Sequence, residues 1–416
     1  MIKLPGKQKS HVAEVHMNIC LPGDDYLPSF DGAVTSIRAY AKEFRKLGHR
    51  VYIPCPVYPD PKDPAKNYTD NEPDIIRYVS RSAPFPPKYR LTFTWQTKVD
   101  WKDWNLDIVH SQSPFPLGYH GLTWARKLRI PAMNTYHTLY PEYINTYINQ
   151  PLVKKPLSYI TKKFSKWVLN KFDLVISPSP QMAEDLVKYG VKKPIEVMPT
   201  GIDLDRFKVN YSGDAFRQKY GIKKEEKMLL CMCRLGREKN VNFLIDALPL
   251  ILKRIPEAKL VICGEGVAKP ELEAQAKRLG IENRILFLGF LSPEDWVNAY
   301  AAEDIFAFAS VTETQGLVLL EAMYFGKPAV SIGEMGVIDV LQGFDKQTGG
   351  FLTKNDVNDF SDKVVSVLSD NSLYEIKARE AKERALEMSS ENMARKMLKI
   401  YERLIEENKT KLVGSK

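Results

Sequence analysis

Residues 304–332 read DIFAFASVTETQGLVLLEAMYFGKPAVSI, and this stretch decides the fold class. The apolar run at 304–310 predicts a buried strand. A polar loop follows, and Gly316 then begins a predicted helix that ends at Tyr324. The apolar run at 328–332 predicts a second strand. Strand, helix and strand in so short a stretch are typical of a βαβ unit in a parallel sheet.

The same alternation continues through the rest of the chain. We predict further strands at 16–20, 50–54, 74–79, 106–111, 131–137, 173–179, 195–199, 227–233, 259–264 and 284–289. This order predicts the α/β class, with two doubly wound, Rossmann-like domains that face a cleft. Ligands of such sheets bind beyond the carboxyl ends of the strands.

The domain boundaries follow from the composition. A polar stretch from 201 to Gly221 is the predicted linker, so we expect an N-terminal domain at 1–200 and a second domain at 201–385. Apolar side chains at helical spacing predict one long helix within 386–416. We expect this helix to return to the N-terminal domain.

Charge is distributed unevenly between the two halves. The 416-residue chain has a net charge of +9, of which residues 1–200 carry +10 and residues 201–416 carry −1. Such asymmetry indicates an anionic partner for the first half, either nucleic acid or an anionic membrane surface. No stretch approaches the about 18 apolar residues of a membrane-spanning helix. The N-terminal ten residues lack the apolar core of a signal peptide, and the five cysteines lie in apolar segments. We therefore expect buried thiols and a cytoplasmic protein.

Two acids flank the start of the predicted helix in the opening stretch. Glu313 precedes Gly316, and Glu321 lies five residues after it, about 7–8 Å along the helix at ~1.5 Å per residue. The unpaired N–H groups at a helix start favour an anion. This spacing suits a nucleotide sugar, with the diphosphate at the helix start and a carboxylate on each side. A glycosidase acid/base pair would need the two carboxyls to converge on one bond.

Other candidate residues follow neighbouring strands of the second half. Arg234 and Lys239 follow 227–233 and suit a diphosphate, although they could be a solvated pair at a turn. Gly264 would let a ligand approach the backbone closely, but many βα turns use glycine. Phe290 and Leu291 could contact a base, or they could pack within their loop.

Together these motifs resemble the retaining GT-B glycosyltransferases of family 4. Glu313 and Glu321 match that family's E-x7-E motif, RLGREKN at 234–240 its Arg-x4-Lys pair, and PTGID at 199–203 its interdomain turn. The resemblance covers nearly the whole chain. It implies that Arg234 and Lys239 stabilise the leaving diphosphate and that Glu313 holds sugar hydroxyls. It further implies that Glu321 binds ribose, and that N–H groups around Gln315, Gly316 and Leu317 bind sugar and phosphate.

The first half resembles the diacylglycerol glucosyltransferase branch of this family. YLPSFDGAVTSIR at 26–38 is similar to the loop that carries a glycine beside the donor diphosphate, which implies that role for Gly32. NTYHTLYPEYINTY at 134–147 is similar to the branch's HT-x-Y segment, which implies that His137 lies near the sugar. A single histidine could also be structural. The implied reaction transfers glucose from UDP-glucose to the hydroxyl of 1,2-diacylglycerol, with no required cofactor and no metal.

A helix is predicted before the strand at 173–179, and its role is open. Within 154–172, the apolar residues Leu157, Ile160, Phe164, Trp167 and Val168 share one face, and Lys155, Lys162, Lys163 and Lys166 lie on another. A basic amphipathic helix of this kind binds anionic membrane surfaces. Its apolar face could instead pack on the sheet. The lysines and the charge of this half favour the membrane, and the aromatic, basic stretch 84–98 could add a second contact.

These observations predict a peripheral enzyme on the inner face of the cell membrane, with anionic lipids, diacylglycerol and a nucleotide sugar as partners and no nucleic acid. Its oligomeric state is not specified by the sequence. A galactosyl- or mannosyltransferase acting on phosphatidylinositol or another lipid is the main alternative. A dinucleotide-dependent oxidoreductase lacks its glycine motif here, because GEG at 264–266 is not G-x-G-x-x-G. A basic nucleic-acid-binding protein would not explain the acids at 313 and 321.

Overall fold

A computed structural model describes residues 16–29, 32–58, 70–82, 90–138, 140, 151–313 and 315–414, apart from the side chains of 151–154 and 344. Four sequence-based statements involve residues outside these ranges. They concern the N-terminal ten residues, two residues of the stretch 26–38, the first part of 84–98 and most of 134–147.

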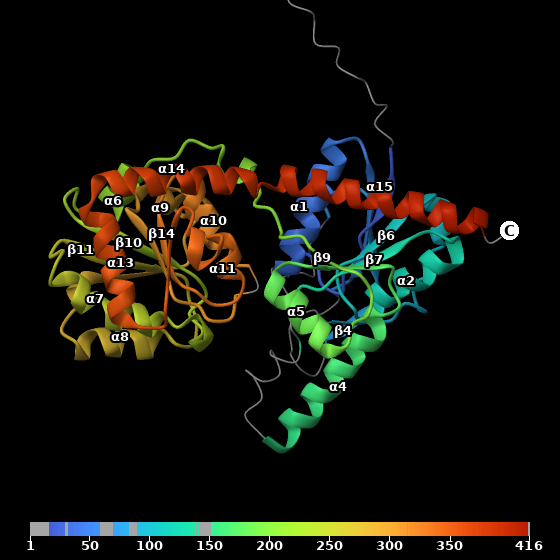
Figure 1. Ribbon diagram of the computed structural model, residues 1–416, viewed down its shortest axis with the longest axis horizontal. Helices are drawn as coiled ribbons and strands as arrows, with labels where there is room; N and C mark the ends of the chain where they lie inside the picture. The colour runs from blue at the N-terminus through green and yellow to red at the C-terminus, as the bar shows by residue number, and fades with distance from the viewer. Residues whose placement is uncertain are drawn as a thin grey trace, which may run out of the picture. The chain divides into compact units, whose positions relative to one another are not determined.

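The first half of the chain builds a seven-stranded sheet with parallel neighbours (Figure 1). In spatial order its strands are β3 (Ile75–Tyr78), β2 (Arg50–Pro56), β1 (Asn18–Cys20), β6 (Ile108–Ser111), β7 (Ala132–Thr135), β8 (Leu174–Ser177) and β9 (Ile195–Val197). Its helices are α1 (Gly32–Lys46), α2 (Pro116–Leu128), α4 (Pro151–Leu169) and α5 (Pro180–Tyr189). An antiparallel hairpin of β4 (Ser80–Ser82) and β5 (Arg90–Thr92) was not predicted. The 3₁₀ helix η2 (Trp101–Trp104) precedes β6.

The second half builds a six-stranded sheet, also with parallel neighbours. Its spatial order is β12 (Ile285–Gly289), β11 (Ala258–Cys263), β10 (Lys227–Met232), β13 (Ile305–Phe308), β14 (Ala329–Ile332) and β15 (Gly350–Thr353). The helices are α6 (Gly213–Lys219), α7 (Val241–Leu252), α8 (Lys269–Arg278), α9 (Pro293–Ala302), α10 (Leu317–Tyr324), α11 (Gly336–Val340), α12 (Gly343–Lys346), α13 (Val357–Ser369) and α14 (Asn371–Glu387). The 3₁₀ helices are η3 (Leu204–Phe207), η4 (Arg237–Lys239) and η5 (Glu282–Arg284).

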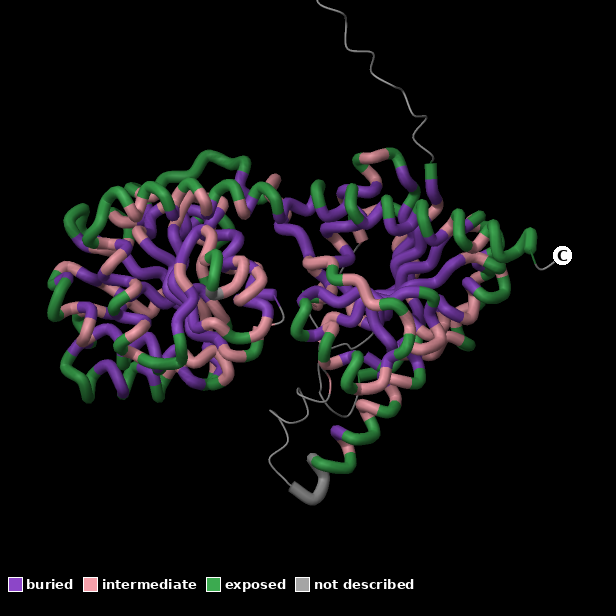
Figure 2. Tube along the Cα trace, viewed as in Figure 1, coloured by how far each residue is buried: buried purple, intermediate pink, exposed green. Residues whose placement is uncertain are grey.

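Both faces of the second sheet are covered, as the doubly wound prediction requires. Side chains of the central strands alternate between the faces. Ile305 and Ala307 belong to the core that contains α7, α8 and α13. Phe306 turns to the opposite face, where its ring lies 6.0 Å from that of Tyr300 in α9. Figure 1 shows α7, α8 and α13 on one side of the sheet and α9, α10 and α14 on the other. In Figure 2 the strands are almost entirely buried.

The last helix, α15 (Ser390–Gly414), packs through the apolar positions that the sequence predicted. Met393, Met397 and Tyr401 are buried, and the Tyr401 hydroxyl lies 2.5 Å from Nδ1 of His110 in β6. Residue contacts divide the chain into two compact units, one of Met1–Asn134, Lys171–Asp173 and Ile400–Lys416, the other of Thr135–Asn170 and Leu174–Lys399. The predicted domain boundaries at 200 and 385 are not tested by this division and stay predictions.

The stretch up to Gly221 that was predicted to be the linker contains short helices. It contains η3 and α6, and its Phe207 and Phe216 are buried. The ring of Phe207 stacks on those of Trp296 and Tyr324. The two aromatic side chains thus anchor the two short helices of this stretch, and its assignment as the linker stays a prediction.

The thiol prediction is confirmed for four of the five cysteines, since only Cys233 is partly exposed. Cys231 and Cys233 face the same side, with their Sγ atoms 3.9 Å apart. Among the helices that the structure describes, none has an apolar run that could cross a membrane.

Candidate active site

Loops at the carboxyl edge of the second sheet bring most of the predicted residues together. Because β10 to β13 are parallel, the loops that follow them emerge at one edge. Hydrogen bonds tie these loops to each other: Leu235 N–H donates to the Glu265 carbonyl at 3.0 Å, and Gly264 N–H donates to the Gly289 carbonyl at 2.7 Å. We call this edge the carboxyl-edge site, formed by Arg234, Lys239, Gly264, Phe290, Glu313, Gln315, Gly316, Leu317 and Glu321.

Glu313 and Lys239 form the centre of the carboxyl-edge site. The Lys239 ammonium makes an ion pair with the Glu313 carboxylate, and the two side chains are only 18% and 17% exposed. The Glu313 carbonyl accepts a hydrogen bond from Gly336 N–H of α11 at 3.0 Å, so the loop is held from a third direction. A solvated pair at a turn therefore does not describe Lys239. The pair places one cation and one carboxylate, both partly withdrawn from water, beside the start of α10.

Arg234, the second predicted cation, lies at the same edge. Its guanidinium pairs with Glu238, and its side chain is 55% exposed. Both cations thus face a carboxylate of the protein. A bound diphosphate would bring further negative charge to the side of each cation that is open to solvent.

The start of α10 has the geometry that the sequence predicted, one residue later. Gly316 is the N-cap, with φ 73° and ψ 52°, a left-handed conformation that glycine adopts without strain. Among the side chains that the structure describes, none caps this helix end. The N–H groups of Leu317 and Val318 have no acceptor within the helix, since the first turn of any α-helix leaves its donors unpaired. The helix start can therefore accept an anion.

The Gln315 side chain has a role that the sequence did not indicate. Its Oε1 accepts from Thr200 N–H at 2.7 Å, and its Nε2 donates to the Thr200 carbonyl at 2.5 Å. The next residue, Gly201, lies so close to Ser390 that a Cβ would approach the Ser390 Cα to 2.5 Å. The 199–203 turn is thus fixed on both sides. The side chain of Gln315 therefore fixes the turn, while its backbone leads into the start of α10.

Glu321 is buried at the second turn of α10, where it meets residues of two other elements. The Tyr300 hydroxyl of α9 donates to Glu321 Oε2 at 2.8 Å, and Arg206 of η3 places Nη1 3.6 Å from Oε1. Arg206 is itself held with its guanidinium 4.4 Å above the Trp296 ring. Burial raises the pKa of Glu321, and Arg206 and Tyr300 oppose this rise. Glu313 and Glu321 have separate partners, as expected for acids that flank a ligand.

The two candidate glycines differ in their surroundings. A Cβ on Gly264, where φ is +130°, would lie 1.9 Å from the Cys233 carbonyl oxygen, so this glycine is required by the approach of two loops. That packing explains Gly264 without a ligand. Gly32 is the first residue of α1, and none of the described residues lies within 4 Å of a Cβ added there. The described part of the chain therefore leaves space at the start of α1.

Phe290 is 81% exposed and Leu291 is partly buried. Packing within the loop therefore does not account for Phe290, whose ring remains available to a planar base.

His137 follows β7, next to Tyr136, whose buried hydroxyl lies 2.7 Å from the Ser165 hydroxyl of α4. Burial lowers the pKa of His137 to about 4, so the imidazole is neutral at pH 7. A neutral ring can hydrogen-bond a sugar hydroxyl as donor or acceptor.

Sequence reasoning missed Arg206, Tyr300 and Thr200. Arg206 lies in the stretch that was predicted to be a linker, and Tyr300 is one apolar position of a helix. Their roles come from contacts across the fold. Thr200 bonds to Gln315, which is 115 residues away, and Tyr300 bonds to Glu321, which is 21 residues away. A motif of adjacent residues could not have revealed them.

Comparison with known proteins gives two family matches that together span most of the chain. Residues 30–206 match the model of Glycosyltransferase Family 4, and residues 212–386 match that of Glycosyl transferases group 1.

Two curated relatives have the same description. The alpha-monoglucosyldiacylglycerol synthase of Streptococcus pneumoniae is 31% identical over 401 residues, which cover 92% of this chain and 85% of the relative. The alpha-monoglucosyldiacylglycerol synthase of Acholeplasma laidlawii is 29% identical over 353 residues, covering 82% of this chain and 86% of the relative. Among solved structures, Anabaena Alr3699/HepE in complex with UDP-glucose has a TM-score of 0.70 at 21% identity and covers 93% of this chain and all of that one.

Proposed function

Because this chain belongs to the family 4 glycosyltransferases of the GT-B fold, we propose that it transfers glucose from UDP-glucose to the hydroxyl of 1,2-diacylglycerol, with retention of the anomeric configuration. The observation that carries the proposal is the Lys239–Glu313 pair beside the uncapped start of α10. It joins a fixed cation, free N–H donors and a carboxylate within one group of loops. The diacylglycerol acceptor is supported by the two synthases to which the chain is similar.

In the proposed reaction, each residue of the carboxyl-edge site acts on one part of the donor. The diphosphate binds the N–H groups at the start of α10 and the cations Lys239 and Arg234, while Glu313 accepts hydroxyls of the sugar. Glu321 accepts ribose hydroxyls, and Phe290 lies against the base. The bond between C1 and the phosphate oxygen breaks, and C1 bonds to the acceptor oxygen on the same face. The hydroxyl proton of the acceptor passes to the leaving phosphate. Fixed cations stabilise the charge that develops there, and the proposal requires no metal or cofactor.

The exposure of α4 supports action at a membrane. The side of α4 that packs on the protein consists of Ser158, Ser165, Val168 and Leu169, which are buried. Ile160 and Trp167, from the predicted apolar face, are 58% and 52% exposed. Packing on the sheet therefore uses only one edge of that face, and Figure 2 shows much of α4 as exposed.

We place the enzyme on the cytoplasmic face of the cell membrane, held by the exposed side of α4 and by Lys155, Lys162, Lys163 and Lys166. An exposed Trp167 beside lysines suits the interface between lipid and water. Strand β5 and the turn that follows it offer a second apolar contact, since Leu91 and Trp95 are 46% and 72% exposed.

Arg206 gives a test of the role of Glu321. The ionised carboxylate accepts ribose hydroxyls better than the protonated one, so the KM for the donor should rise as the pH falls through the pKa of Glu321. Without Arg206 that pKa rises further, and the increase in KM should begin at a higher pH. We expect Arg206→Gln to raise the donor KM about two- to fivefold, because its side chain is half exposed. KM measured against pH checks this. Arg206→Lys should restore most of the wild-type dependence of KM on pH. Coincident dependences for wild type and Arg206→Gln would contradict the role given to Arg206.

A panel of substrates tests the proposed function. We expect radiolabel to pass from UDP-glucose to diacylglycerol in mixed micelles. Transfer only from UDP-galactose or GDP-mannose, or only to phosphatidylinositol, would favour the galactosyl- or mannosyltransferase alternative. Transfer to soluble sugars but never to lipid would contradict a lipid acceptor. Family membership leaves no reason to propose an oxidoreductase or a nucleic-acid-binding protein.

A further inference from the structure

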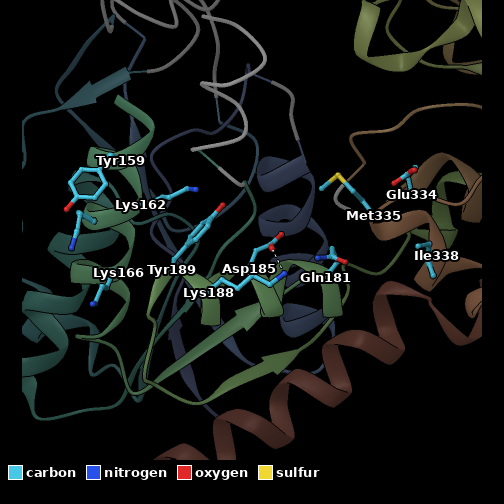
Figure 3. Close-up of a pocket in the computed structure, with 11 residues that line it drawn as sticks. Tyr159, Lys162, Lys166, Gln181, Asp185, Lys188, Tyr189, Glu334, Met335 and Ile338 are labelled. Carbon is cyan, nitrogen blue, oxygen red and sulfur yellow. Dashed lines mark hydrogen bonds and ion pairs between the residues drawn. The ribbon is translucent and has the colours of Figure 1, made fainter. Parts of the chain in front are cut away.

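A recess of about 620 Å³ lies beside α4 and α5 (Figure 3). Its lysines on α4 belong to the membrane contact proposed above, and Lys188 of α5 is ion-paired with Asp185 at 3.2 Å. The recess therefore adds no further site. A different group, the thiols of Cys231 and Cys233, lies at the end of β10 next to Arg234 and has no part in the proposed reaction.

The thiols of Cys231 and Cys233 lie side by side. Their Sγ atoms are 3.9 Å apart, because residues two positions apart in an extended chain point to the same side. Cys231 is buried and Cys233 is partly exposed, so solvent reaches one thiol of the pair. Cys263 of β11 is in register with Met232, and its side chain therefore points to the opposite face of the sheet from Cys231.

The two thiols differ in reactivity. The neighbouring Cys233 thiol and burial raise the pKa of Cys231, and the charge of Lys239 opposes this rise. Cys231 therefore stays protonated at pH 7, and its reach is limited to the adjacent sulfur. Oxidation begins at accessible thiols, and a second cysteine beside such a thiol converts the first oxidised product into a disulfide. Cys233 has the position of the first thiol and Cys231 that of the second.

We propose that Cys231 and Cys233 form a redox-sensitive pair, whose oxidation to a disulfide by a peroxide weakens donor binding at the carboxyl-edge site. The inference rests on the donor site of the proposed function. Disulfides in reducing compartments are usually transient and serve catalysis or redox sensing. A reversible disulfide at this position is of the second kind.

The oxidation takes place in two steps. The Cys233 sulfur attacks one oxygen of hydrogen peroxide, the O–O bond breaks, and the products are a sulfenic acid and water. The Cys231 sulfur then attacks the Cys233 sulfur, and the sulfenic hydroxyl leaves with the Cys231 proton as a second water. Two thiols thus lose two electrons and two protons, and the peroxide is reduced to water. A dithiol reductant reverses the reaction.

The disulfide would displace the loop that carries Arg234. The two sulfurs must approach from 3.9 Å to about 2.05 Å. Alternate residues of a strand have Cα atoms about 6.6 Å apart, close to the limit of about 6.8 Å for a disulfide, so the strand end must bend. The Cys233 carbonyl cannot move toward Gly264, where even a Cβ would lie 1.9 Å from its oxygen. The bend therefore passes to Arg234, the next residue.

The test measures donor affinity and thiol state on the full chain. The protein is treated with hydrogen peroxide, freed of it with catalase, and titrated calorimetrically with UDP-glucose before and after reduction by dithiothreitol. We expect oxidation to weaken binding by about tenfold, the loss of one charge-assisted hydrogen bond, and dithiothreitol to restore it. Both cysteines lie in one tryptic peptide, 228–234. The disulfide should make this peptide two hydrogens lighter and protect it from alkylation.

Three variants serve as controls. Cys233→Ser and Cys231→Ala each remove one thiol of the pair, and we expect their affinity for UDP-glucose to be unchanged by peroxide. Cys263→Ala removes a buried thiol of the opposite face and should respond to peroxide as wild type does. Thermal unfolding of the reduced variants shows that they are folded, and either variant of the pair is sufficient for the comparison.

Several outcomes would overturn the proposal. Alkylation of both cysteines after peroxide, or a sulfinic acid at Cys233 beside a free Cys231, would show that the pair does not close. A disulfide that leaves the affinity unchanged would separate it from the donor site. Equal losses for wild type and Cys233→Ser would assign the effect to other residues. If reduced wild type binds no UDP-glucose, the proposed function fails instead, and the peptide masses still decide whether the disulfide forms.

Discussion

Replacing Lys239 by methionine is expected to lower kcat by about 10²- to 10³-fold, which is the cost of removing one fixed group that stabilises developing charge. Methionine keeps much of the length of the side chain but has no charge. Lys239 is only 18% exposed and pairs with Glu313, so its charge acts with little screening by water. The loss should appear in kcat, because the charge on the leaving diphosphate grows as the bond to the sugar breaks. Steady-state kinetics with UDP-glucose and diacylglycerol measures it.

Arg237→Met is the matched control for Lys239→Met. Arg237 belongs to the same short helix, η4, but its side chain is 78% exposed and pairs with Glu271 at the surface. We expect its kcat to stay within about twofold of wild type, since exposed ion pairs contribute little. Similar losses for the two variants would show that general charge, not the position of Lys239, supports turnover.

Replacing Glu313 by glutamine is expected to lower kcat by about 10²-fold while changing the donor KM little. The amide keeps the shape of the side chain but loses the charge that pairs with Lys239 and that, in the proposed reaction, accepts sugar hydroxyls. For Glu321→Gln we expect the change in the donor KM instead of kcat. It should raise the donor KM and change kcat little, because the proposed partner of Glu321 is the ribose, which does not change in the reaction.

This split between Glu313 and Glu321 distinguishes a donor site from an acid/base pair. In a glycosidase-like pair, either change would lower kcat. Equal effects of the two glutamine variants on kcat would therefore contradict the roles assigned to them. Donor KM and kcat for both variants, measured in the same assay, distinguish a donor site from an acid/base pair.

The parallel strands could be predicted because burial on both faces requires short runs of consecutive apolar residues, which are easily recognised in the sequence. All twelve predicted strands are present, with ends that differ by a few residues; 304–310, for example, contains β13 at Ile305–Phe308. β15 was missed because its sequence begins with glycine, a weak strand former. The structure explains Gly350, since a Cβ there would lie 2.0 Å from the Ala329 carbonyl oxygen of β14.

Residues of the site that lie close in the sequence could be predicted, and those joined across the fold could not. Glu313, Gly316 and Glu321 stand in one motif, and their loop and helix follow from the spacing. The contacts of Glu321 with Tyr300 and Arg206 depend on how α9 and η3 pack, which no local pattern specifies. The roles of Arg206 and Thr200 could therefore be recognised only in the three-dimensional structure.

The helix at 154–172 shows the same limit. Its helical wheel correctly separates apolar side chains from lysines, but it does not say which side packs. In the structure, α4 packs through Ser158 and Ser165 with Val168 and Leu169. Small hydroxyl side chains allow close packing of the helix, and this leaves Ile160 and Trp167 exposed.

Hexosyl transfer to a lipid with retention is tested most directly by the anomeric configuration of the product. The protein is incubated with UDP-α-glucose labelled with ¹³C at C1 and with diacylglycerol in micelles, and the lipid fraction is examined by NMR. We expect an α-glucosyl diacylglycerol whose labelled C1 is bonded to the acceptor oxygen. A β-linked product, or release of free glucose with no labelled lipid, would contradict it.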